Sequence, residues 1–194
     1  MSFGGYFEKF RKRWQNPETI LSRVGLMSGF TFIDVGCGNG FFAIPAAHIV
    51  GEKGTVYGID IDGSAISMLK EIARTESLNN LVLKVGRAEE TILCENCADI
   101  VFLANDLHDF KDPNKVLKNA KKMIKPNGRL VDIDWKKETM TMPGPPLQIR
   151  LNEEEASNLI KATGFEVETI EEAGPYHYLI IAKPKILTQA PAEV

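Results

Sequence analysis

The chain has 194 residues, of which 44% are hydrophobic and 25% charged, and its formal net charge at pH 7 is -3. This is the composition of one globular domain with an ample core, and the small negative charge argues against nucleic acid or any other purely electrostatic partner. No apolar stretch approaches the roughly 20 residues that a membrane span needs, and residues 1–6 lack the pattern of a signal peptide. We therefore expect a cytoplasmic protein, independent of membranes, whose three cysteines are reduced thiols rather than a disulfide framework.

Residues 3–14 are rich in aromatic and basic side chains. At helical spacing the aromatic ones share one side, which predicts an amphipathic arm packed on the domain. The basic ones fit a solvated face better than a binding site. Residues 16–18, Asn-Pro-Glu, supply a cap, a first-turn proline and a first-turn acid, and so predict a helix that ends near Gly25 or Gly29. The aromatic residues of the arm are Tyr6, Phe7, Phe10 and Trp14.

A short apolar run at residues 30–35 leads into three glycines at alternate positions, Gly36, Gly38 and Gly40. The run predicts a buried strand, and residues 41–50, which contain one proline near their start, predict a helix. The glycines permit positive φ and remove Cβ atoms from the loop. A ligand is therefore expected to lie against bare backbone amides at the start of the helix.

Two acids indicate the kind of ligand. Asp34 precedes the loop by two residues, and position 41 is Phe where the dinucleotide fingerprint has its last glycine. An acid there would repel a pyrophosphate and suits a cation instead. Asp60 ends a predicted strand at residues 55–60, at about the distance of 20 residues that brings a second-strand carboxylate to ribose hydroxyls. A nucleoside with a cationic tail fits both acids.

The stretches Asp34–Gly40 and Val56–Asp62, together with the turn Lys125–Leu130, resemble the class I S-adenosylmethionine-dependent methyltransferases, particularly the small single-domain ones. The resemblance covers residues 17–183. It implies an α/β fold, a Rossmann-like three-layer sandwich whose mostly parallel seven-stranded sheet has an antiparallel last strand. It also implies S-adenosyl-L-methionine as cofactor.

The resemblance divides the chain into an N-terminal helical arm or lid (1–29), a methyltransferase core (30–183) and a flexible tail (184–194). In the resembled family the segment before the core often closes the active site, so the lid and the packed arm both remain open as interpretations.

The resemblance also assigns a cofactor site, with the methionine end at Asp34 and the loop, and the ribose at Asp60. The chain departs from the family after the third predicted strand, where Arg87 stands in place of an acid and cannot accept a hydrogen bond from adenine. Either Glu89 or the backbone of Arg87 and Ala88 is expected to take that role. The predicted cofactor-binding residues are Asp34, Gly36, Cys37, Gly38, Gly40, Asp60, Ile61, Ala88 and Asn105.

The rest of the chain continues the alternation of strands and helices. Helices are expected at about 62–77, 112–124 and 151–164, with Asp62 or Ser64, Asp112 and Asn152 as their caps. Strands are expected at 81–85, 98–104 and 129–134, a turn at 126–128, a proline-rich loop at 136–150, and a terminal hairpin from 165–170 and 176–183.

Cys94 and Cys97 form a Cys-x-x-Cys pair. A zinc site needs about four ligands, and neither a second pair nor a nearby histidine is present. The pair therefore predicts a turn with two semi-buried thiols. Arsenite methyltransferases use cysteines, but the place of Cys37 inside the cofactor loop argues against that chemistry, and no metal is expected.

Residues 105–110 form a polar cluster at the end of the fourth predicted strand, where open parallel sheets bind ligands. His108 matches a histidine often found there in small methyltransferases and is the candidate general base, with a structural histidine bonded to backbone as the alternative. Asp106 and Asp109 cap the loop or steer the substrate and rank below His108. Asp132 and Asp134, alternating along the fifth strand, are expected to border the pocket.

The motifs favour in-line methyl transfer to a small-molecule acceptor. The motifs that methyltransferases use on the amines of bases and on cytosine C5 are absent, which also disfavours nucleic acid. Two other classes stay open: a non-catalytic module that binds adenosylmethionine or adenosylhomocysteine, and, more weakly, an NAD-dependent oxidoreductase. The acceptor and the oligomeric state are not indicated by the sequence.

Overall fold

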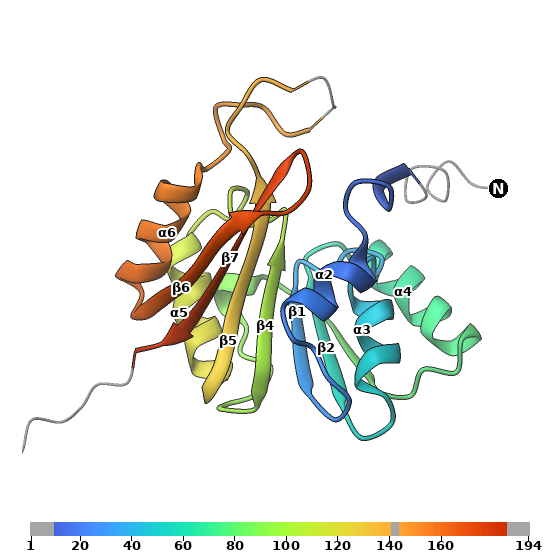
Figure 1. The fold of residues 1–194 in the computed structure, drawn as a ribbon. Coiled ribbons are helices and arrows are strands. Elements are labelled where there is room, and N and C mark those ends of the chain that lie inside the picture. The colour runs from blue at the N-terminus through green and yellow to red at the C-terminus, as the bar shows by residue number, and fades with distance from the viewer. Residues whose placement is uncertain (1–9, 141–143, 186–194) are drawn as a thin grey trace, which may run out of the picture.

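The structure is a computed structural model that describes residues 10–140 and 144–185. Within these residues, seven strands form a sheet in the order β3-β2-β1-β4-β5-β7-β6 (Figure 1). Neighbours from β3 to β5 pair in parallel, and β7 runs antiparallel to both β5 and β6. The predicted fold class, including the antiparallel last strand, is confirmed. The strands are β1 (Thr31–Val35), β2 (Thr55–Asp60), β3 (Leu81–Val85), β4 (Ala98–Ala104), β5 (Ile124–Trp135), β6 (Phe165–Glu172) and β7 (His177–Pro184).

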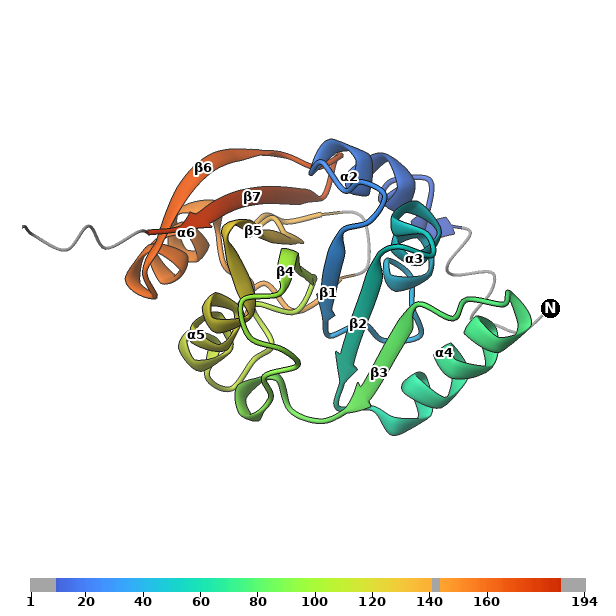
Figure 2. The ribbon, with the colours of Figure 1, turned by 90° about the horizontal axis from the view of Figure 1, so that it is seen from below.

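Helices cover both faces of the sheet, which gives the three layers seen in Figure 2. On one face lie α2 (Pro17–Arg23), α3 (Ala43–Val50) and α4 (Gly63–Thr75). The other face carries α5 (Pro113–Met123) and α6 (Glu153–Ala162), and a short turn of 3-10 helix, η1 (Ala88–Glu90), links β3 to β4.

Three helices begin where capping residues predict. The Asn16 side chain accepts a hydrogen bond from Thr19 N at 2.8 Å and opens α2, and Asp62 accepts from Ser64 N at 2.8 Å and opens α4. Asn152 and Glu155 form a reciprocal capping box at the start of α6. Each cap satisfies backbone N–H groups that have no partner inside the helix.

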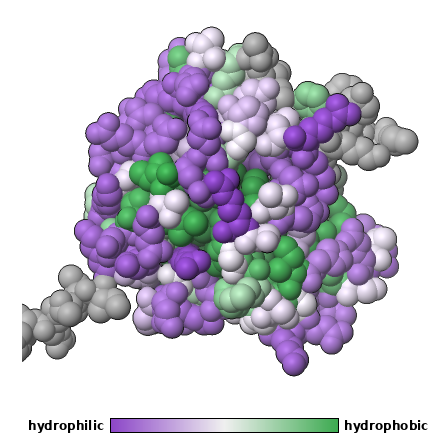
Figure 3. Space-filling view, in the orientation of Figure 1, coloured by the Kyte–Doolittle hydropathy of each residue, from purple (hydrophilic) through white to green (hydrophobic). Residues whose placement is uncertain are grey.

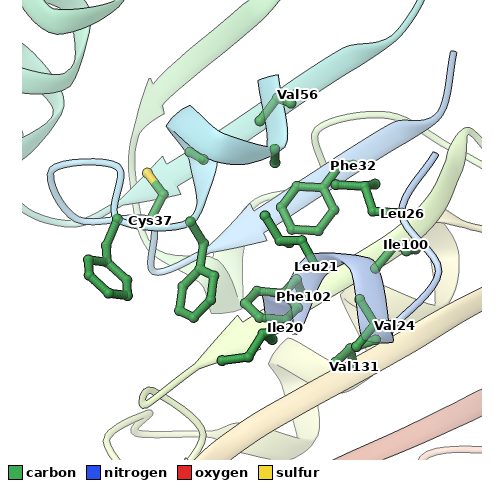
Figure 4. Close-up of a cluster of buried hydrophobic side chains, with 14 of the residues drawn as sticks. Ile20, Leu21, Val24, Leu26, Phe32, Cys37, Val56, Ile100, Phe102 and Val131 are labelled. Carbon is green, nitrogen blue, oxygen red and sulfur yellow. The ribbon is translucent and has the colours of Figure 1, made fainter. Parts of the chain in front are cut away.

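The core lies on both faces of the central strands. On the α3 side, Phe32 of β1 and Phe102 of β4 pack with Leu21 of α2, and all three side chains are fully buried (Figure 4). On the α5 side, Val101 and Leu103 of β4 pack into a second cluster. Burial of both faces explains why β4 is a continuous apolar run, as the sequence predicts.

Strand β5 starts earlier than expected, so the turn predicted at 126–128 lies within the strand. The register against β4 shifts from the pair Ala98 and Ile124 to the pair Ile100 and Arg129. A Cβ on Gly128 would lie 2.6 Å from the Ala98 carbonyl oxygen. The glycine therefore lets the irregular part of β5 stay against its neighbour instead of turning away from it.

Cys94 and Cys97 form a disulfide, so the expectation of two reduced thiols is wrong. The turn between them includes Asn96 at positive φ and holds their Cα atoms 6.0 Å apart, a separation that a disulfide spans. The sequence argument predicted a turn here but did not anticipate that the turn brings the two sulfur atoms together. Cys37 is a free, buried thiol.

Some predictions fall outside the described residues: those on Tyr6, Phe7 and the rest of 1–9, on Pro143, and on tail residues 186–194. No helix in the described ranges combines the length and apolar character that crossing a bilayer requires. The face seen in Figure 3 is mainly hydrophilic, with apolar side chains gathered in separate groups.

Candidate functional site

The carboxyl ends of the parallel strands meet along the upper edge of the sheet in Figure 1, and a cleft of about 440 Å³ opens there. Its wall is built from Gly36 after β1, Asp60 and Ile61 at the end of β2, residues 86–89 after β3, and Asp106 with residues 109–111 after β4. Four residues predicted to bind a cofactor, Gly36, Asp60, Ile61 and Ala88, therefore line one cleft. Within the described ranges, the others are not on its wall: Asp34, Cys37, Gly38, Gly40 and Asn105.

The backbone amides of the glycine loop are largely occupied, contrary to the expectation that they face a ligand. Gly36 N and Cys37 N both donate to the Ile59 carbonyl, at 2.8 and 3.1 Å, and Gly40 N donates to Cys37 O at 2.9 Å. Gly38 N donates to Asp60 Oδ2 at 2.7 Å. A loop whose amides are used internally cannot cradle a pyrophosphate with them, which argues against dinucleotide binding.

Two of the glycines are required by packing. Gly36 has φ +77, and a Cβ there would collide with the Asp106 carboxyl group. Gly40 has φ +97, and a Cβ there would collide with Leu69 of α4. The loop thus allows the Asp106 carboxyl group to pack on Gly36 and α4 to pack on Gly40.

Cys37 turns its side chain into the core, as Figure 4 shows. Its sulfur packs on β2, where a Cβ at Gly58 would lie 2.9 Å from it. Burial, followed by the negative charges of Asp34 and Asp60, raises the pKa of the Cys37 thiol. The thiol is therefore protonated, and the side chain of Cys37 is not available for a ligand.

Asp34 is 2% exposed, and its Oδ2 has no hydrogen-bond partner among the described residues. Burial raises the pKa of Asp34 to about 7; the Arg11 charge opposes this rise, the Asp60 charge adds to it, and a hydrogen bond from Ala43 N at the start of α3 opposes it. Asp60 is held differently, because its second oxygen, Oδ1, accepts from Asp62 N at 2.8 Å. One carboxyl oxygen of Asp34 thus lies beside the loop without a hydrogen-bond partner among the described residues.

The segment after β3, residues 86–89, lines the cleft. Asn119 of α5 donates to the carbonyl oxygens of Ala88 and Glu89 at 3.0 and 2.9 Å, which fixes this turn. The Glu89 carboxylate is buried and accepts from Arg87 at 3.2 Å. Arg87 therefore restrains Glu89, and both of the expected adenine acceptors stay on the wall of the same cleft.

His108 is paired with Asp134 of β5. His108 Nδ1 lies 2.7 Å from Asp134 Oδ1, and His108 N donates to Oδ2 at 3.2 Å. Because a carboxylate only accepts, Nδ1 carries the proton in this pair and Nε2 is left as the basic nitrogen. Burial is the largest influence on the pKa of His108 and lowers it, but the hydrogen bond and charge of Asp134, with Asp109, outweigh burial and raise it overall.

Residues 10–15 of the N-terminal segment lie against this edge of the sheet. Gln15 is fully buried and exchanges long side-chain hydrogen bonds with Asn105, of 3.3 and 3.5 Å. Arg11 donates to Gln15 at 2.7 Å, and its guanidinium lies 3.9 Å from the centre of the Phe41 ring. Asn105, which was predicted to contact the cofactor, is thus hydrogen-bonded to Gln15 of the arm.

Trp14 joins the arm to the C-terminal hairpin. Its ring stacks on His177 at a centroid distance of 5.1 Å and lies 5.6 Å from Trp135. A Cβ on Gly174 would lie 2.7 Å from the Trp14 carbonyl oxygen. Burial, followed by the charges of Arg11, Arg150 and Lys136, lowers the pKa of His177 to about 3, so this histidine is neutral.

Sequence reasoning missed three features of the site. The pairing of His108 with Asp134 joins residues 26 positions apart, and only the alternation of acids in the fifth strand indicated it. The burial of Asp106 against Gly36 and the contact of Gln15 with Asn105 had no signal in the sequence.

Asp132 is expected to make the protein less stable as pH rises. It is fully buried on the α5 side of β5, and neither carboxyl oxygen has a partner among the described residues. Burial, followed by the Asp134 charge, raises the pKa of Asp132 well above its usual range. The folded state therefore binds the proton more tightly than the unfolded state, and this group's contribution to stability falls as pH rises from the unfolded pKa of about 3.9 through the folded one.

Replacing Asp132 by Asn should remove this effect. Urea denaturation measures the free energy of unfolding of the variant and of wild type at each pH. The variant value minus the wild-type value should be about 1–3 kcal/mol larger at pH 8 than at pH 5. The control is Asp109→Asn, which changes an exposed carboxyl. An equal difference from wild type at both pH values would show that Asp132 is not the titrating group.

A model of the methyltransferase-domain family matches residues 26–176 of this chain. Among solved structures, a SAM-dependent methyltransferase from Aquifex aeolicus is 32% identical and superposes with a TM-score of 0.84 over 89% of this chain and 91% of that one.

Curated relatives also match in sequence, and two of them illustrate the range. A demethylmenaquinone methyltransferase from Oceanobacillus iheyensis is 31% identical over 129 residues, which are 66% of this chain and 53% of that protein. A probable cobalt-precorrin-6B C(15)-methyltransferase (decarboxylating) from Sulfurisphaera tokodaii is 32% identical over 112 residues, 57% of this chain and 56% of that protein. The chain spans about half the length of these two relatives.

Proposed function

Because the chain belongs to the family of methyltransferase domains, we propose that it is an S-adenosylmethionine-dependent methyltransferase acting on a small-molecule acceptor. The observation that carries this proposal is the pair of unpartnered carboxyl oxygens at the glycine loop. The loop amides are used internally, while buried carboxyl oxygens of Asp34 and Asp106 have no partner among the described residues. Such a site fits a cationic nucleoside and does not fit a dinucleotide.

Each part of the cleft has a role in this proposal. Asp60 accepts from the ribose hydroxyls, Ile61 and the turn at Ala88 enclose the adenine, and Asp34 with Gly36 receives the methionine end. Cys37, Gly38 and Gly40 contribute through the backbone course of the loop, and Asn105 through its contact with the arm. Residues 1–29 form the arm, 30–183 the core and 184–194 the tail.

When bound, the cofactor supplies a methyl group already activated on a sulfonium. The chain's own residues align the acceptor and exclude water, an effect that can be worth about 7–11 kcal/mol. For an acceptor that loses a proton, His108 Nε2 takes that proton while Asp134 holds the ring by Nδ1. Asp134 is then a positioning residue.

The names of the curated relatives indicate where an acceptor screen should begin. They refer to demethylmenaquinone and to cobalt-precorrin-6B, so the screen should start with quinols and tetrapyrroles. As part of the same proposal, the acceptor is not a nucleic acid, and the protein acts in the cytoplasm.

Calorimetric titration with adenosylmethionine, adenosylhomocysteine and NADH tests the cofactor. We expect binding of the first two, and Asp60→Ala should weaken it by about 10- to 100-fold, because a carboxylate that accepts two hydroxyl hydrogen bonds is lost. The matched control is Asp62→Ala, which removes an acid bonded to the start of α4. Binding of NADH alone would overturn the proposal, and binding without turnover of any acceptor would favour a non-catalytic module.

A further inference from the structure

Asp106 is a half-buried acid whose carboxyl group the fold does not explain. Its Oδ2 is buried and has no partner among the described residues. Its carboxyl group rests directly on Gly36, at the place where any side chain on that residue would begin. Oδ2 therefore has no structural partner among the described residues, and yet Asp106 is placed on the wall of the cleft.

The position of Asp106 along the cleft is informative. The wall runs from Ile61 and residues 86–89, past Asp60 and Gly36, to Asp106. In adenosylmethionine a single methylene joins the ribose to the sulfur. A ribose held at Asp60 therefore leaves the sulfur beside Gly36, the residue on which Asp106 rests.

We propose that Asp106 is the counter-charge of the sulfonium and shifts the binding preference of the site toward adenosylmethionine and away from adenosylhomocysteine. This inference rests on the proposed function. After methyl transfer the sulfur is a neutral sulfide, so the Asp106 carboxylate no longer attracts it. The amino group of the product keeps its charge. Loss of the methyl group would thus also favour product release.

The surroundings of Asp106 support a role for a bound cation. Burial, followed by the charges of Asp34 of β1, Asp134 of β5 and Asp60 of β2, raises the pKa of Asp106 well above its usual range, and Arg11 of the arm opposes this rise. In the empty site Asp106 therefore holds a proton more tightly than a free carboxyl does. A cation that binds beside it should displace that proton.

The test is calorimetric titration of wild type and Asp106→Asn with adenosylmethionine, adenosylhomocysteine and sinefungin, which carries a protonated amine in place of the methylsulfonium. We expect the variant to bind the two ligands with a cationic centre about 10- to 100-fold more weakly and adenosylhomocysteine within about threefold of wild type. Titration in buffers of different ionisation enthalpy should show proton release with adenosylmethionine in wild type and less release in the variant.

The matched control is Asp112→Asn, the same substitution at an exposed acid that caps α5 and is not on the wall of the cleft, which should leave the ratio of the affinities unchanged because asparagine keeps the cap. Asp106→Ser removes the carboxylate without adding volume and serves if the Asn variant does not fold. Equal weakening of all three ligands would assign Asp106 to the ammonium group and overturn the inference, as would unchanged affinities. A wild-type protein that binds none of the three would instead overturn the proposed function itself.

Discussion

Replacing His108 by Ala is expected to lower kcat by about 100- to 10,000-fold with an acceptor that must lose a proton. The buried pair with Asp134 fixes the ring so that Nε2 is the basic nitrogen at the end of β4. Affinity for adenosylmethionine should stay within about threefold of wild type, because His108 is not on the wall of the cofactor cleft. Release of adenosylhomocysteine with the best acceptor from the screen measures the rate.

The matched control is His48→Ala, which removes an exposed histidine bonded to Glu76 at 2.9 Å and should leave kcat unchanged. The pH profile separates a base from a structural histidine. A base must be neutral, so activity should rise with pH through the raised pKa of His108, and Asp134→Asn should move this acidic limb to lower pH. If His108→Ala keeps the wild-type rate and profile, His108 is structural.

Replacing Gly40 by Ala is expected to lower the free energy of unfolding by about 2–5 kcal/mol, the sum of a left-handed backbone cost and an overpacking cost. Gly40 has φ +97, and a Cβ would collide with Leu69, a fully buried residue of α4. Urea denaturation of wild type and variant measures the loss.

Gly38 supplies the comparison, because it also has positive φ, +52, but a Cβ there meets no atom within 4 Å. Gly38→Ala should therefore lower the free energy of unfolding by only about 1–2 kcal/mol. Equal losses in the two variants would show that Leu69 yields easily and that packing does not require a glycine at position 40.

Local signals predicted much of this fold. Three caps were recognisable because each accepts a hydrogen bond from an N–H group only two or three residues further along the chain. They are Asn16, Asp62 and Asn152. The continuous apolar run of β4 and the terminal hairpin were likewise visible, since each depends on short-range pattern.

The site was predictable only where a motif is local. The glycine loop and Asp60 identified the cleft, but the use of the loop amides by Ile59 depends on how β1 lies beside β2. Because β4 lies between β1 and β5, His108 can pair with Asp134 and the Asp106 carboxyl group can contact Gly36. Strand order of this kind is a tertiary property that no window of sequence contains.

The insertion of β7 between β5 and β6 has a consequence for biosynthesis. Because β7 follows β6 in the chain, the sheet cannot join β5 to β6 until β7 has been made. Trp135 pairs with His177, and Trp14 stacks on the same histidine. The arm precedes β7 in the chain, so its packing against His177 can form only after the strands that line the cofactor cleft have been made.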